Sequence, residues 1–245
     1  MPVPSVKEIN DGEYLPVDDE HRLPHLRPEG RPGRVAAVPG VRGIPEMLSE
    51  HLDLLDYRRN VAEIYARVRS RPDEEGWRRW VRDRDDLFAG HPQSAVEDRE
   101  TFTGLHYYEY DPAWRVIGSF ILDPGAEVDV AHSDTGATKF NSIGRIEFTI
   151  GGKVMSLGAL WLAGYAGGLF VPFRDRTNGK GTYGGGRYLL DTAKGADLGH
   201  DGDLIVLDFN FAYHPSCVYS PRWSCPLAPP GNHLDVAVTA GERLV

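Results

Sequence analysis

The chain has 245 residues, of which 41% are apolar, and a formal net charge of −9. This length fits one or two domains, and the apolar fraction is large enough to form a buried core. The acidic balance without a basic run excludes a phosphate-backbone footprint, so we expect no nucleic acid. Because no apolar run approaches the length of a bilayer span, we also expect no membrane.

Residues 1–45 are rich in proline and in scattered charge, and they show little periodicity. This composition predicts a proline-rich arm, in which only residues 35–38 could pair as a short strand. The first residues lack the positive and apolar regions of a secretory signal, so we expect a cytoplasmic protein. Two cysteines are too few for a disulfide scaffold.

Residues 46–245 are predicted to form a single β-rich domain that begins with helices at 46–69 and 73–89. In the first helix, apolar residues recur at helical spacing until Pro72 interrupts the pattern. Asp73 is suited to cap the second helix, and Gly90 to the left-handed position past its end. The apolar stripe of the second helix contains Trp77, Trp80, Val81 and Phe88.

From Leu105 onward the apolar period falls toward two, and turn signals such as Pro-Gly and Asp-Gly separate the segments. Crossover helices are absent after residue 100, which favours antiparallel pairing. The predicted fold class is therefore α+β, mainly antiparallel β in a barrel or sandwich, with two N-terminal helices. The expected strands are LHYYEY, WRVIGSFIL, IGRIEFTI, VMSLGALWL, LFVPF, GRYLLD, LIVLDFNFAY and LDVAVT.

The segments FVPFRDRTNGKGTYGGGRYLLD, VLDFNFAYHPSC and CPLAPPGNHLDVAVTAGE resemble the DUF1684 family of uncharacterised bacterial proteins. WRRWVRDRDDLFAGHPQSAV and FTGLHYYEYDP are similar to the leading part of that family, so the resemblance spans roughly residues 57–243. It implies a shared scaffold without a known activity, and the chain departs from the family pattern at His214 and His233. It also implies a shared site near Asp175, Thr177, Thr182, Tyr183, Gly186, Arg187, Asp208, Asn210, Tyr213, Cys217 and Cys225.

Two short motifs have plainer interpretations than their formal matches. Gly179, Gly181 and Gly184 match G-x-G-x-x-G, but a strand-like segment follows where a dinucleotide site needs a helix. A mobile hairpin loop is favoured, and the alternative is a loop whose amides and Arg187 hold an anion. Asp134-Thr135-Gly136 matches an aspartic-protease motif, but a single copy favours a β-turn.

The spacing H-x2-C-x7-C-x7-H joins His214, Cys217, Cys225 and His233. Two thiolates and two imidazoles could bind zinc, but the spacing is unlike that of compact zinc sites. A disulfide and a reactive cysteine beside His214 are further alternatives, and free thiols are favoured in a reducing cytoplasm. We therefore expect neither a metal nor a cofactor.

The acid/base interpretation concerns Asp208 and Asn210, which flank Phe209 and would share one face of a strand. Asp208 or Asp175 is the candidate general base, and Tyr183 or His214 the candidate acid. Arg187 would anchor an anion, and the other predicted ligand-binding residues are Thr177, Asn210 and Tyr213.

The site is expected where the 175–187 loop meets the 208–217 segment, with Arg187 close to Asp208. Arg187→Ala is then expected to weaken ligand binding more than folding. The alternative is a buried Asp–Arg pair with a structural role.

Three functions remain open, and whether the protein is an enzyme is one of the questions. The first is a small-molecule enzyme with metal-independent acid/base chemistry in a β-barrel pocket. The second is a non-catalytic binding protein for a small anionic or aromatic ligand. The third is a flavin-binding barrel, in which the glycine loop and Arg187 hold the phosphate. A homodimer is compatible with all three.

Overall fold

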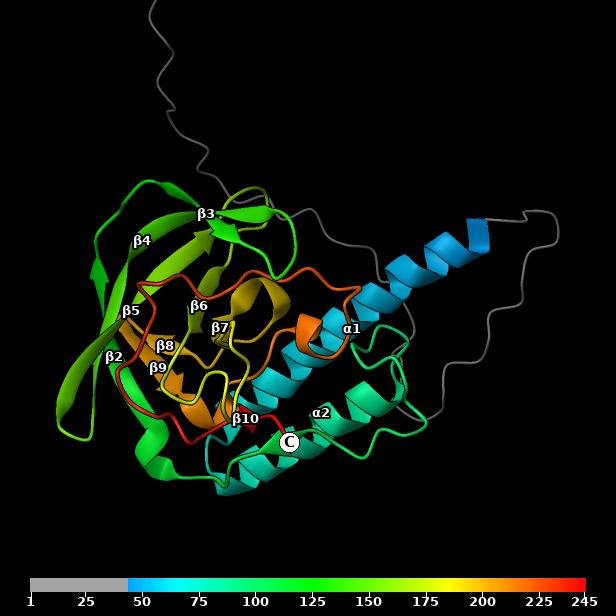
Figure 1. Ribbon diagram of the computed structural model, residues 1–245, viewed down its shortest axis with the longest axis horizontal. Helices are drawn as coiled ribbons and strands as arrows, with labels where there is room; N and C mark the ends of the chain where they lie inside the picture. Colours follow the sequence, from blue (N-terminus) through cyan, green and yellow to red (C-terminus); the bar gives the residue numbers. More distant parts are fainter. Residues whose placement is uncertain (1–43) are drawn as a thin grey trace, which may run out of the picture. The chain divides into compact units, whose positions relative to one another are not determined.

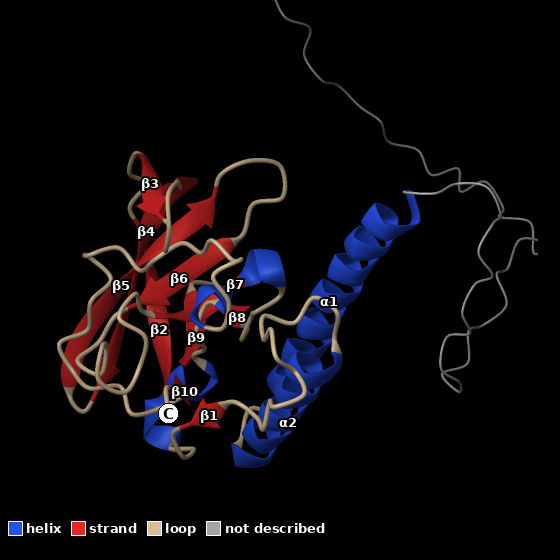
Figure 2. Ribbon diagram, turned by 45° about the vertical axis from the view of Figure 1, so that its right-hand side comes forward, coloured by secondary structure: helices blue, strands red, loops and turns tan. Residues whose placement is uncertain are grey.

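The structure, a computed structural model, describes residues 44–245, which belong to one compact unit. Two long helices lie on one side and a curled β-sheet on the other (Figure 1). The view in Figure 2 separates the two layers and shows α1 extending past the sheet. The strand expected at 35–38 and nearly all of the predicted arm lie outside the described residues.

The helices are α1 (Ile44–Ser70) and α2 (Glu74–Gly90), where 46–69 and 73–89 were predicted. Asp73 caps α2 as expected, because its side chain accepts a hydrogen bond from the Gly76 N–H at 2.9 Å. Gly90 is instead the last helical residue and has no positive φ, since an extended His91 closes the helix. None of the described helices is apolar enough over a sufficient length to cross a bilayer.

All the strand pairs are antiparallel, as the short connections predict. One sheet has the order β7-β6-β5-β4-β2-β9-β8, with β3 paired to β4, and a second sheet joins β1 to β10. The strands are β1 (His106–Tyr107), β2 (Arg115–Leu122), β3 (Glu127–Ala131), β4 (Ala137–Ile150), β5 (Lys153–Leu162), β6 (Leu169–Phe173), β7 (Arg187–Asp191), β8 (His200–Asp201), β9 (Leu204–Asp208) and β10 (Glu242–Arg243).

The large sheet curls into a half-barrel, with β7 and β8 as its edges. The α+β class with two N-terminal helices is thus confirmed, and neither a closed barrel nor a two-sheet sandwich forms. A bulge in β4 shifts the pairing with β5 between Ser142 and Gly144. Bulges increase local twist and bending, which helps the long β4 to follow the curl of the sheet.

One apolar core fills the space between the sheet and the helices. Trp80 is fully buried, and its ring meets Tyr65, Tyr107 and Phe211 edge-on. Among residues 48–70 of α1, the buried side chains are those of Ile64, Tyr65 and Val68, all in the second half of the helix. The expected stripe does not continue toward the N-terminal end of α1, where Leu48, Leu52 and Leu55 are 54–55% exposed.

Two expected strands differ from the structure near the C-terminal end of the sheet. LIVLDFNFAY stops being a strand at Asp208 and turns into a 3-10 helix, Phe209–Phe211. LDVAVT forms no strand, although its backbone bonds to the segment after β6. Leu234 N–H donates to the Arg174 carbonyl, and Arg176 N–H donates to the Val236 carbonyl. β3 and the first half of β4 were not predicted, but the turn at Asp134–Gly136 does connect them.

Gly144→Ala should lower the free energy of unfolding by more than about 2 kcal/mol. Gly144 has a φ of +143°, and an added Cβ would lie 2.1 Å from the Ile121 carbonyl oxygen, so strain and clash add together. Gly90→Ala is the matched control, because nothing lies within 4 Å of its added Cβ. Urea denaturation of both variants checks this, and equal stabilities would contradict it.

Candidate functional site

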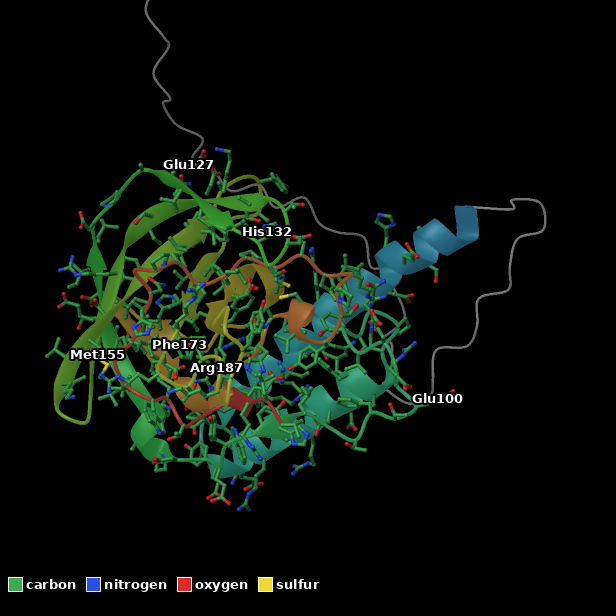
Figure 3. All side chains as sticks on the ribbon, viewed as in Figure 1. Glu100, Glu127, His132, Met155, Phe173 and Arg187 are labelled. Carbon is green, nitrogen blue, oxygen red and sulfur yellow. The ribbon has the colours of Figure 1, made fainter. Side chains whose placement is uncertain are left out.

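The 174–186 loop is held by a polar lock that we define as Asp175, Arg187 and the carbonyls of Val238, Ala240 and Glu242. Arg187 Nη2 donates to Asp175 Oδ2 at 2.9 Å and to the Val238 carbonyl at 2.9 Å. Arg187 Nη1 donates to the carbonyls of Ala240 and Glu242. Both side chains of the ion pair are 0% exposed. In Figure 3, Arg187 lies beside Phe173, whose ring its guanidinium faces at 5.1 Å. This buried pair is the structural arrangement that the sequence left open.

Backbone amides of the glycine loop are used within the loop itself. The N–H groups of Lys180, Gly181 and Thr182 all donate to the Thr177 carbonyl, and Gly179 N–H donates to the Thr182 carbonyl. Thr177 and Thr182 are buried and share a 2.8 Å hydroxyl contact. These bonds argue against the expected mobile hairpin. They also occupy four of the loop amides that could otherwise face an anion.

A second buried network surrounds Glu242, which the sequence analysis did not select. Glu242 Oε2 accepts from Arg84 Nη2 at 2.8 Å and from the His214 backbone N–H at 3.0 Å. Burial by itself raises the pKa of Glu242, but the charge of Arg84 and the hydrogen bonds from His214 outweigh it and hold that pKa below its ordinary value. The network reaches the glycine loop, because Tyr183 N–H donates to His214 Nε2 at 3.2 Å.

Asp208 and Asn210 form a third group at the end of β9. Asp208 Oδ1 accepts from the Asn210 backbone and side chain, at 3.0 and 2.8 Å. Asp208 Oδ2 is buried without a hydrogen bond, 3.7 Å from Arg115 Nε. Burial raises the pKa of Asp208 to about 6, although Asn210 and Arg115 oppose the rise. The carboxylate that Arg187 contacts is therefore Asp175, and the expected approach of Arg187 to Asp208 is wrong.

The two cysteines are free thiols, and the two histidines of the same motif make contacts elsewhere. Cys217 is on a 3-10 turn, Ser216–Val218, and the buried Cys225 follows eight residues later. His214 Nε2 is directed to Tyr183, and His233 bridges to Arg174. Among residues 44–245 no group of three or more His, Cys, Asp or Glu could hold a metal ion.

The eight predicted site residues thus divide into three groups, of which the first two meet at Glu242. Asp175 and Arg187 form the lock, and Thr177 N–H donates to Asp175. Tyr183 and His214 belong to the Glu242 network, where the ring of Tyr213 lies 5.1 Å from the Arg84 guanidinium. Asp208 and Asn210 lie beside Arg115. The missed Arg84 had a signal, because it lies four residues from both Trp80 and Phe88 on the buried stripe of α2. Glu242 and Arg115 had no local signal.

A cavity of a different kind lies at one end of the half-barrel, and none of the eight predicted residues lines it. Its volume is about 600 Å³, within the range of small-molecule sites. It lies where β2, β5 and β7 end and where β6 and β9 begin. We call it the apolar cavity, after its lining of Phe120, Leu122, Ile143, Trp161, Leu169, Leu190 and Ile205. Two smaller cavities reach predicted residues, one of 350 Å³ at Asp208 and one of 390 Å³ at His214.

Comparisons with known proteins agree with this architecture. The family described as a protein of unknown function, DUF1684, matches residues 100–243. A solution NMR structure of an uncharacterised protein from Haloarcula marismortui is 40% identical, covering 70% of this chain and 94% of that one, with a TM-score of 0.52. No curated protein matches the chain. The fold is thus an antiparallel half-barrel with two leading helices, and the chain belongs to the DUF1684 family.

Arg187→Ala should lower the free energy of unfolding by about 3–5 kcal/mol, because it leaves the Asp175 carboxylate buried without its partner. Arg176→Ala is the matched control, since Arg176 pairs with Asp235 in solvent and such pairs contribute less than about 1 kcal/mol. Urea denaturation measures both. If the two variants were equally stable, Arg187 would have no structural role, and the hypothesis that it anchors an anionic ligand would be supported.

Asp208→Asn should change how stability depends on pH. A raised folded-state pKa means that the protonated carboxyl stabilises the fold fully below its unfolded pKa of about 3.9, and that this contribution is lost as pH rises through about 6. The uncharged Asn keeps an acceptor for Asn210. The free energy of unfolding of the variant should therefore rise by about 3 kcal/mol relative to that of the wild type as the pH goes from about 4 to about 7. Unfolding curves measured across this interval test it, and parallel profiles would contradict it.

Proposed function

We propose that this protein binds a small molecule with an apolar or aromatic body in the apolar cavity. The observation that carries the proposal is that core side chains line this cavity. Leu190 and Ile205 belong to the buried core, and Phe120, Ile143 and Leu169 are half-buried side chains packed against it. A ligand in this cavity would therefore extend the core of the protein, and burial of its apolar surface would supply the affinity.

The rim of the cavity indicates what charge the ligand carries. Asp197 and Asp203 line it together with Thr192 and His200, and no lysine or arginine does so among the described residues. An anionic ligand would meet Asp203 and also Asp197, which pairs with Arg69 at 3.5 Å, and Arg187 is fully buried elsewhere. Of the sequence-based alternatives, the aromatic ligand is thus favoured over the anionic one and over a flavin phosphate held by Arg187.

Two exposed side chains at the mouth provide the contact surface for such a ligand. Trp161 is 43% exposed at the end of β5, and Leu122 is 71% exposed at the end of β2. Large exposed apolar residues beside a concave apolar surface are typical of ligand sites rather than of ordinary solvent-facing strands. Trp161 would cover one face of the bound molecule, and an aromatic contact of this kind contributes about 1 kcal/mol or more.

Trp161→Ala should weaken binding of the uncharged aromatic dye Nile red about tenfold, measured by fluorescence titration, because the ligand loses its aromatic contact. The control is Val154→Ala, since Val154 is 76% exposed at the other end of the same strand. It should bind the dye as the wild type does. The proposal is wrong if the wild type does not bind Nile red, or if both variants bind it equally well.

A second candidate, acid/base catalysis, rests on Asp208. This carboxyl lines the 350 Å³ cavity, which shares Gly199 and His200 with the apolar cavity. A pKa of about 6 suits a general base near neutral pH, and Asp208 Oδ2 has no hydrogen-bond donor of its own. A metabolite screen would distinguish the two functions, because catalysis requires that Asp208→Asn abolish turnover while Nile red still binds.

A further inference from the structure

The 390 Å³ cavity at His214 is lined by two residues whose buried polar atoms have no hydrogen-bond partner among residues 44–245. It lies between the segment that follows α2, the 3-10 turn Ser216–Val218 and β10. The two atoms are His214 Nδ1 and the hydroxyl oxygen of Tyr219. A buried polar atom without a partner costs free energy, and a molecule in the adjoining space can supply the missing bond.

The proton on the His214 ring can be located from its other nitrogen. Nε2 lies 3.2 Å from the Tyr183 backbone nitrogen, whose N–H can only donate, so Nε2 is the acceptor and carries no proton. The proton of the neutral ring is therefore on Nδ1. Glu242 Oε1 is 3.6 Å from Nδ1, which is too far for a hydrogen bond. Because Glu242 lines the cavity and Tyr183 does not, the Nδ1 edge of the ring is the one beside the cavity.

The charges around the cavity favour an uncharged ligand. Glu242 Oε2 is already paired with Arg84 Nη2 at 2.8 Å. Among the exposed lining residues, the Asp98 carboxylate is matched by the Arg243 guanidinium. The two carboxylates are thus balanced by two guanidinium groups, and no net charge remains to select an ion.

Aromatic rings and polar groups alternate around the rest of the lining. Phe102 and Tyr219 are half-buried, and both meet the ring of Phe88, at centroid distances of 6.4 and 5.3 Å. Thr103 and His106 are exposed lining residues that offer further hydrogen-bonding groups. An apolar wall with a few polar groups suits a small molecule that has both a carbon face and hydroxyl groups.

We propose that this cavity is a second ligand site, which takes a small uncharged polyhydroxylated molecule of the monosaccharide class. One hydroxyl group of the ligand accepts from His214 Nδ1–H and donates to Glu242 Oε1, because a hydroxyl can do both. A second hydroxyl bonds to the Tyr219 hydroxyl, and the carbon skeleton packs on the aromatic wall. The cavity shares no lining residue with the apolar cavity, so this site does not rest on the function proposed above.

Tyr219→Phe should weaken monosaccharide binding about tenfold and leave the melting temperature equal or higher, since the lost hydroxyl makes no hydrogen bond within the described protein. The probes are D-glucose, D-galactose and D-mannose, each titrated against the full chain and followed by saturation-transfer NMR. Tyr65→Phe is the matched control, because its hydroxyl is also buried without a partner but does not line this cavity. It should bind the sugars as the wild type does.

A second measurement addresses His214 directly. In the full chain with isotope-labelled histidine, NMR should find the ring proton of His214 on Nδ1, and the signal of this nitrogen should move when the sugar is added. The signal is assigned from its absence in His214→Gln, in which the amide oxygen can still accept from Tyr183.

The proposal is wrong if the wild type binds none of these sugars, which would leave the cavity to water. It is also wrong if Tyr219→Phe binds as tightly as the wild type, or if Tyr65→Phe loses binding to the same extent. A His214 signal that does not respond to a saturating sugar would place the ligand elsewhere on the protein.

Discussion

The ion pair between Arg187 and Asp175 is the interaction on which the rest of the half-barrel depends. Removing two charges from water has a large energetic cost, and it is tolerated here because each partner finds further hydrogen bonds. Asp175 Oδ1 accepts from the N–H groups of Thr177 and Val238, and Arg187 donates to three carbonyls of the C-terminal segment. One guanidinium thereby ties the loop after β6, the start of β7 and the last segment of the chain together.

This arrangement separates the ion pair of Arg187 and Asp175 from the surface that is open to ligands. The residues with the most distinctive chemistry in the sequence, Asp175, Arg187 and His214, are buried and hydrogen-bonded to their neighbours, although Arg187 Nε and His214 Nδ1 have no hydrogen-bond partner. The accessible features are the apolar cavity at one end of the sheet and the half-exposed thiol of Cys217. In this fold, therefore, the densest polar motif of the sequence belongs to the buried structural framework. The concave surface is formed by apolar residues that are less conspicuous in the sequence.

Much of the architecture follows from local patterns in the sequence. The helical and alternating periods locate α1, α2 and most strands, and Asp73 locates a helix start. The missing part is non-local: the sequence shows that Arg187 needs a carboxylate, but the choice between Asp175 and Asp208 depends on strand order. Glu242 was overlooked for the same reason, since its partner Arg84 is 158 positions away. The apolar cavity was invisible because its lining combines residues from many strands with residues of the segments that connect them.

The position of Val238, Ala240 and Glu242 in the chain has a consequence for how the protein is made. Val238, Ala240 and Glu242 come after every strand of the large sheet, yet they satisfy Arg187 and Arg84 inside the core. A ribosome delivers them after the large sheet, so a nascent chain that has emerged as far as β9 still lacks the Glu242 carboxylate that pairs with Arg84 and the carbonyls that accept from Arg187. Contacts this distant in sequence close slowly. During synthesis the half-barrel should therefore stay open and dependent on chaperones until this segment emerges.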